Sequence, residues 1–132
     1  MEKNSPKSRS SFEKVKKYSL KAIQLILIFI LLDFLSTFVA IKVLAIAEEK
    51  NPIAVALWEE LGFWQGSIYL TSVMIAPLIF MYFAILFAPT ETKLGKAFLS
   101  FSGGILILRI IAGIVTLINN YGILTQFFLS KL

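Results

Sequence analysis

The sequence predicts an all-α, polytopic membrane protein with three transmembrane helices and a short interfacial helix in the outer loop. Three observations support this fold class. Of the 132 residues, 58% are hydrophobic and only 16% are charged, so the chain is more apolar than soluble domains usually are. The apolar residues form three long runs, each near the length that crosses a bilayer. Polar segments with proline and glycine separate these runs.

The N-terminal residues 1–21 are polar and carry seven Lys or Arg against two Glu. Basic residues beside a membrane span mark the cytoplasmic side and attract anionic lipid. The Ser, Lys and Pro content of this tail predicts disorder. We expect no nucleic-acid binding, because aromatic residues are not interleaved with the basic ones.

The first span is predicted at residues 22–47, at the start of a membrane domain that covers residues 22–132. A second interpretation stays open, because the Ala-Ile-Ala sequence at 45–47 resembles a signal-peptide cleavage site and follows a basic segment. The apolar run is about twice as long as the usual 7 to 15 residues of a signal peptide and contains Asp33. Both features favour an uncleaved span.

The outer loop, residues 48–66, interrupts the apolar pattern with charges, proline and glycines. Within it, residues 52–61 have helical spacing and include Trp58, which is typical of an interfacial helix. We expect Asn51 to be the N-cap of this helix and Pro52 to be its first residue. The glutamates of the loop lack the spacing of a calcium loop and are interpreted as solvated.

The second and third spans are predicted at residues 67–88 and 97–118. The second has no charge and one proline, Pro77, which a membrane helix tolerates. The third carries one charge, Arg109. Residues 119–132 begin with Asn-Asn-Tyr-Gly, which is typical of a helix end. This segment is expected either to lie along the interface or to prolong the third helix.

Topology follows from the Lys and Arg residues outside the spans. Seven precede the first span, one is in the first loop, two are in the second loop, and one follows the third span. This distribution predicts a multi-pass protein of the cell membrane with its N-terminus in the cytoplasm and its C-terminus outside.

The absence of Cys and His removes the common zinc, haem and iron–sulfur ligands, thiol nucleophiles and imidazole bases. Asp33 is the only aspartate, so a two-aspartate intramembrane protease is excluded. We identify no Ser and Lys pair at a shared depth and helix face. We therefore expect no enzyme activity, no cofactor and no metal site.

Three charged residues lie inside predicted spans: Lys42 near the outer end of the first, and Asp33 and Arg109 near the middle of theirs. Each of the latter two costs roughly 3 kcal/mol or more if it faces lipid. Counted from the predicted inner ends of their spans, Asp33 and Arg109 lie at similar depths, about 17 and 18 Å. We therefore predict a bidentate pair between them that holds the first helix against the third. Ser36 and Thr37 share a face with Asp33, and Thr116 shares one with Arg109, so these three are supporting polar positions.

These features favour a structural or accessory role, in which the protein packs in a larger membrane complex or self-associates. Three helices are few for a transport path, so other membrane subunits or further copies are the expected partners. The alternative is an oligomeric ion or proton conductor or transporter that uses Asp33 with Thr37. A third option is a pore-forming or membrane-perturbing small protein.

Two short motifs, D-x3-T on the first helix and E-x-N-P after it, are followed by two spans that end near an asparagine. The residues concerned are Asp33, Thr37, Glu49, Asn51 and Pro52, with Asn119 or Asn120 at the end. Over residues 22–120 the chain resembles a family of small uncharacterised bacterial and archaeal membrane proteins, a three-span domain of unknown function. The resemblance implies topology and polar positions but no activity. Such proteins often carry a Lys in the second span, which this chain lacks, so Arg109 is the expected cation beside Asp33.

Overall fold

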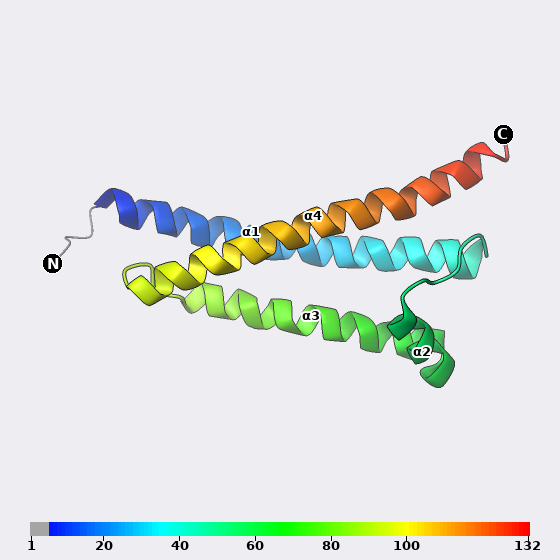
Figure 1. Ribbon diagram of the computed structural model, residues 1–132, viewed down its shortest axis with the longest axis horizontal. Coiled ribbons are helices and arrows are strands. Elements are labelled where there is room, and N and C mark those ends of the chain that lie inside the picture. The colour runs from blue at the N-terminus through cyan, green and yellow to red at the C-terminus, as the bar shows by residue number, and fades with distance from the viewer. Residues whose placement is uncertain (1–5) are drawn as a thin grey trace.

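The computed structural model describes residues 6–132, and their side chains from residue 11 onward. This part of the chain is helical and contains no strand (Figure 1). Its elements are α1 (Pro6–Phe38), the π-helical segment η1 (Val39–Val43), α2 (Pro52–Leu61), α3 (Phe63–Phe87) and α4 (Lys93–Leu129). Three stretches are long and apolar enough to cross a membrane: Ser11–Val43, Phe63–Phe87 and Lys93–Leu129. The predicted fold class, with a short helix in the outer loop, is confirmed.

Helix α1 is the element on which both other long helices pack. Helices α1 and α4 run in the same direction and cross, and α3 runs back antiparallel to them (Figure 1). Buried residues recur at intervals of three and four in residues 19–30 of α1 and 95–106 of α4, the spacing of a helix-packing seam. They are Ser19, Ile23, Ile26 and Ile30 on α1 and Gly95, Leu99, Ser102 and Leu106 on α4; Ser36 of α1, Ala40 of η1 and Leu124 of α4 are buried further along. Asp33 and Asn120 both fall on these lines.

The basic tail differs from the expectation of disorder. Helix α1 begins at Pro6, so residues 6–21 are helical, and residues 1–5 lie outside the described part. Lys16 donates a hydrogen bond to the carbonyl of Ala88 (3.1 Å), and Glu13 accepts one from the hydroxyl of Thr90 (2.8 Å). Composition alone missed this order because the α3–α4 turn supplies the partners.

The loop between η1 and α2 confirms the predicted cap. Asn51 accepts a hydrogen bond through Oδ1 from the amide of Ile53 (3.0 Å), and proline opens α2. Glu49 accepts a further bond from the amide of Asn51 (2.8 Å). Helix α3 begins at Phe63, four residues earlier than predicted, directly after Gly62 with its positive φ of 82°. The first helical run ends at Val43 rather than at residue 47.

Helix α4 corrects the predicted end of the third span. It continues through Asn119, Asn120 and Gly122 to Leu129, a length of about 55 Å. The structure therefore takes the second of the two alternatives for residues 119–132, prolongation of the third helix. The asparagines do not end the helix, because Asn120 makes its side-chain hydrogen bonds to α1 instead.

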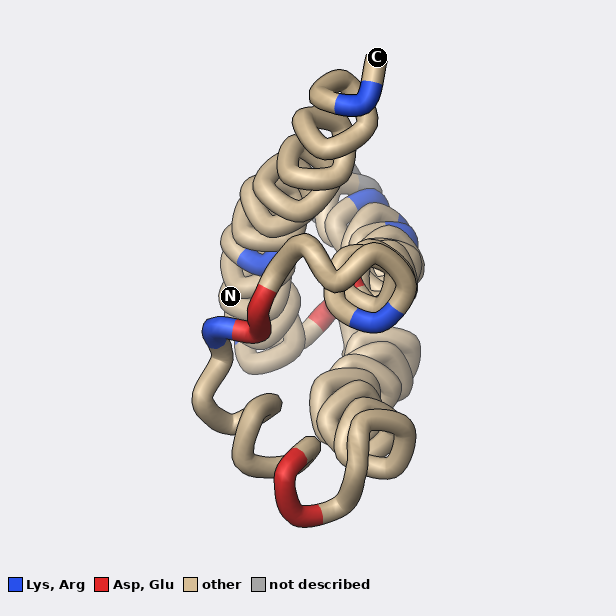
Figure 2. The backbone as a smooth tube through the Cα atoms, turned by 90° about the vertical axis from the view of Figure 1, so that its right-hand side faces the viewer, with Lys and Arg blue, Asp and Glu red and all other residues tan. Residues whose placement is uncertain are grey.

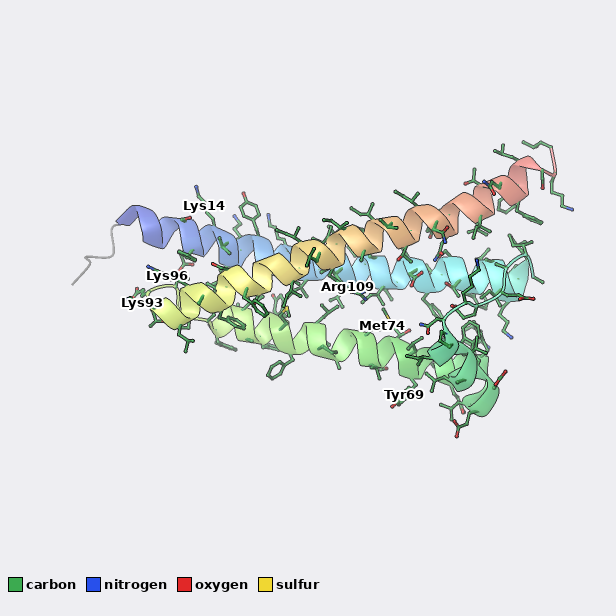
Figure 3. All side chains as sticks on the ribbon, in the orientation of Figure 1. Lys14, Tyr69, Met74, Lys93, Lys96 and Arg109 are labelled. Atoms are coloured by element: carbon green, nitrogen blue, oxygen red, sulfur yellow. The ribbon has the colours of Figure 1, made fainter. Side chains whose placement is uncertain are left out.

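Most of the charged residues lie at the two ends of the bundle. Lys14, Lys93 and Lys96 lie together at the end that contains the N-terminus (Figure 3). Figure 2 faces the opposite end, where the acidic residues of the α1–α2 loop and of α2 lie; all of them are Glu, and the loop also contains Lys50. The sequence predicts the first of these ends to be inside and the second to be outside.

Candidate functional site

Asp33 is the centre of a polar cluster in the seam between α1 and α4. Its carboxyl oxygen Oδ1 accepts a hydrogen bond of 2.6 Å from Nδ2 of Asn120. The same amide group donates to Oγ of Ser36 at 3.1 Å, and Ser36 in turn donates to the backbone carbonyl of Asp33 at 2.9 Å. Ser36 is only 2% exposed, whereas Asp33 is half-buried. The cluster therefore links two helices that are far apart in the sequence.

The predicted pair between Asp33 and Arg109 is not formed, although both residues lie in the described part of the chain. Asp33 bonds to Asn120, and the Arg109 side chain is exposed on α4, about 16 Å before Asn120 along the helix.

The register of α1 against α4 explains this correction. The backbone of Gly103 faces Ser19, and that of Gly113 faces Phe29. The members of each pair are 84 positions apart in the sequence. The same offset places Arg109 opposite residue 25 rather than opposite Asp33. The prediction counted depth from residues 22 and 97 as if they were level, but in the structure α4 is displaced by several residues towards the N-terminus of α1.

A cavity of about 670 Å³ opens beside the Asp33 cluster, between α1, α3 and α4. The α1–α2 loop and α2 line its outer part. Its polar lining residues are Asp33, Ser36, Thr37, Glu48, Glu49, Lys50, Asn51, Ser67, Thr71, Thr116, Asn119 and Asn120. This volume lies within the usual range of small-molecule sites. Three carboxyl groups against one ammonium give the lining an acidic balance that favours a cationic or hydrogen-bonding occupant.

The cavity unites most of the residues that the sequence singled out. Thr37, Glu49 and Asn51 line it, and so does Thr116, which donates a hydrogen bond to a carbonyl of its own helix (3.0 Å). Two predicted residues lie outside the lining: Arg109, and Pro52, which is the first residue of α2.

Aromatic side chains fix the outer wall of the cavity. Trp58 of α2 donates through Nε1 to the hydroxyl of Ser67 on α3 (2.9 Å), which orients two lining residues. Phe38, at the end of α1, lies 5.2 Å from the ring of Trp64 and 6.0 Å from that of Phe63. Ring contacts of this kind hold the start of α3 against α1, and the Trp58 bond holds α2 against α3.

Residue-by-residue reasoning missed Ser67, Thr71 and the role of Asn120. Ser67 and Thr71 are four residues apart in an otherwise apolar span, a spacing that places them on one helix face. Asn120 appeared only as one of two choices in the family resemblance. Asn120 rather than Asn119 lies four residues before the buried Leu124, on the side of α4 that packs against α1.

Comparisons with protein-family models, with curated proteins and with solved structures gave no match. Within residues 6–132 there is no group of three or more Asp, Glu, His or Cys side chains placed to hold a metal ion. The chemistry available at the site is therefore hydrogen bonding and charge, presented inside a membrane-spanning fold.

Proposed function

We propose that this protein is an accessory membrane subunit that packs against other membrane-spanning chains or against copies of itself, with its N-terminus in the cytoplasm. The observation that carries the proposal is Arg109. Its side chain is exposed on α4, and none of the described residues forms an ion pair or hydrogen bond with it. A guanidinium that faces hydrocarbon is costly, so a neighbouring chain that covers it stabilises the membrane-inserted state.

The Asp33 cluster supports this role by making α1 and α4 one unit. Asn120 ties the two helices near their outer ends, and apolar side chains such as Ile23 and Leu99 pack along their inner halves. A pair held in this way presents the exposed face of α4 in a fixed orientation, as docking to a partner requires.

Native mass spectrometry of the protein, extracted gently from its own membrane, tests the proposal. A complex with a defined number of other subunits, or of copies of this chain, is the expected result. A subunit mass near 14.8 kDa would also exclude cleavage after Ala47. A chain that stays monomeric at every detergent-to-protein ratio and in lipid nanodiscs would contradict the accessory role.

The cavity favours a second candidate, a cation conductor or transporter in which Asp33 and Thr37 line the path. Its support is the acidic lining and the size of the cavity. The test is flux of protons, Na⁺ or K⁺ into vesicles that contain the purified protein. If the protein conducts cations, cation flux into these vesicles should exceed the flux into empty vesicles, and anion flux should not. Equal cation flux into vesicles with and without the protein would exclude a conducting function.

A further inference from the structure

The depth of Arg109 follows from contacts at both ends of α1. Lys16 bonds to the carbonyl of Ala88, the residue after α3, so these two positions are level at the inner end of the bundle. Residue 25, which lies opposite Arg109, is about 13 Å further along α1. Helix α3 is about 37 Å long and has no charge, so the level of Arg109 lies well inside the apolar zone.

The surroundings of Arg109 on α4 are apolar. It is the only charged residue between Lys96 and Lys131. Its neighbours Ile105 and Leu108 are 39% and 68% exposed. A single cation on such a surface is what a partner with a complementary charge would recognise.

The exposed side of α4 also has the spacing of a packing seam. Ile105, Arg109, Ala112, Thr116 and Asn119 follow one another at intervals of four, three, four and three, and all five are exposed. Thr116 and Asn119 also line the cavity, so this side of α4 is continuous with it. We call these five residues the Arg109 face. Intervals of this kind let one helix pack along another, and the small Ala112 allows close approach.

A second copy of this chain does not supply the matching acid. Asp33 is the only acidic residue within the three apolar runs, and it is bonded to Asn120. It also lies about 12 Å further outward than residue 25, the level of Arg109. Copies inserted in the same orientation keep this difference in depth, so Arg109 of one copy and Asp33 of another are not level.

We propose that the Arg109 face binds a transmembrane helix of a different protein, one that carries Asp or Glu at the depth of Arg109. This inference rests on the proposed accessory function and specifies the chemistry of the partner. The bond is a charge-assisted guanidinium–carboxylate pair, which an arginine makes in bidentate form and a lysine does not.

The test uses synthetic membrane-spanning peptides of leucine with one substitution. One peptide carries Glu at the centre, a second carries Leu there, and a third carries Glu about 12 Å nearer one end. Binding to the full-length protein in vesicles is measured by fluorescence transfer. We expect the central-Glu peptide to bind about tenfold more tightly than the all-Leu peptide. The peptide with Glu nearer one end should bind more weakly than the central-Glu peptide.

Variants of the protein complete the test. Arg109→Leu is expected to lose the preference for Glu, and Arg109→Lys to keep part of it, while Leu108→Ala serves as the matched control beside the face. Circular dichroism and fluorescence transfer between α1 and α4 report whether each variant is folded. Equal binding of the Glu and Leu peptides, or an undiminished preference in folded Arg109→Leu, would overturn the inference.

Failure of this inference is distinguishable from failure of the proposed function. If native complexes with other subunits survive Arg109→Leu unchanged, the accessory role stands and the assigned face is wrong. If the native complex contains only copies of this chain and Arg109→Leu dissolves it, the partner is a second copy and the inference is overturned. If no complex forms at all, the proposed function itself fails.

Discussion

The most direct test of the Asp33 cluster is replacement of Asn120 by leucine. The change removes the 2.6 Å bond to Asp33 and the 3.1 Å bond to Ser36 while keeping a side chain of similar size. Hydrogen bonds between membrane helices contribute about 0.6 kcal/mol on average and about 1.7 kcal/mol at most. Because two bonds are lost and a half-buried carboxyl group loses its partner, we expect Asn120→Leu to lower the free energy of unfolding by about 1–2 kcal/mol.

The neighbouring Asn119 provides a matched control. It lines the same cavity but is exposed and makes no bond to Asp33, so Asn119→Leu should change stability by less than about 0.5 kcal/mol. The chain has no natural cysteine, so dyes on cysteines introduced at Lys42 and Gln126 would report separation of α1 from α4 during an SDS titration. Equal losses of stability in Asn119→Leu and Asn120→Leu would refute the stabilising role of the Asp33 cluster. Additive effects of Asp33→Leu and Asn120→Leu in a double-mutant cycle would refute the pairing.

Two further predictions concern the α3–α4 turn and the topology. A Cβ added at Gly95 would overlap the carbonyl oxygen of Pro89, whereas one at Gly104 would meet nothing within 4 Å. Gly95→Ala should therefore destabilise the protein by about 2 kcal/mol or more, and Gly104→Ala should be neutral or slightly stabilising, as measured in the same titration. For topology, a membrane-impermeant maleimide added to intact cells should label Glu60→Cys and not Lys93→Cys, both exposed positions at opposite ends of the bundle; labelling of Lys93→Cys alone would reverse the proposed orientation.

The parts of the fold that could be predicted are those set by local properties of the chain. Hydropathy and length identify the three spans, because hydrocarbon demands about 20 apolar residues per helix. The cap at Asn51 followed by Pro52 was also predictable, since an N-cap depends on residues within a single turn.

The pairing inside the site was not predictable in the same way. The partner of Asp33 depends on how far α4 is displaced along α1, and no local pattern encodes that displacement. Estimates of depth counted from span ends carry errors of a few residues, and each residue shifts a side chain by about 1.5 Å. Here the error is larger: the contacts of Gly103 and Gly113 place Arg109 level with residue 25, eight residues or about 12 Å before Asp33.

Substitutions of Asp33 separate the two candidate functions because its charge and its hydrogen bonding can be removed independently. Asp33→Asn keeps an oxygen that accepts from Asn120 but abolishes the charge, whereas Asp33→Leu removes both. If the cluster is a structural clamp, Asp33→Asn should keep most of the stability and the native complexes, and Asp33→Leu should lose about 1–2 kcal/mol. If the cavity conducts cations, both variants should lose flux although Asp33→Asn remains folded. Wild-type flux in a folded Asp33→Asn variant would exclude a conducting role for this carboxyl group, because a neutral amide cannot supply the charge that attracts the cation.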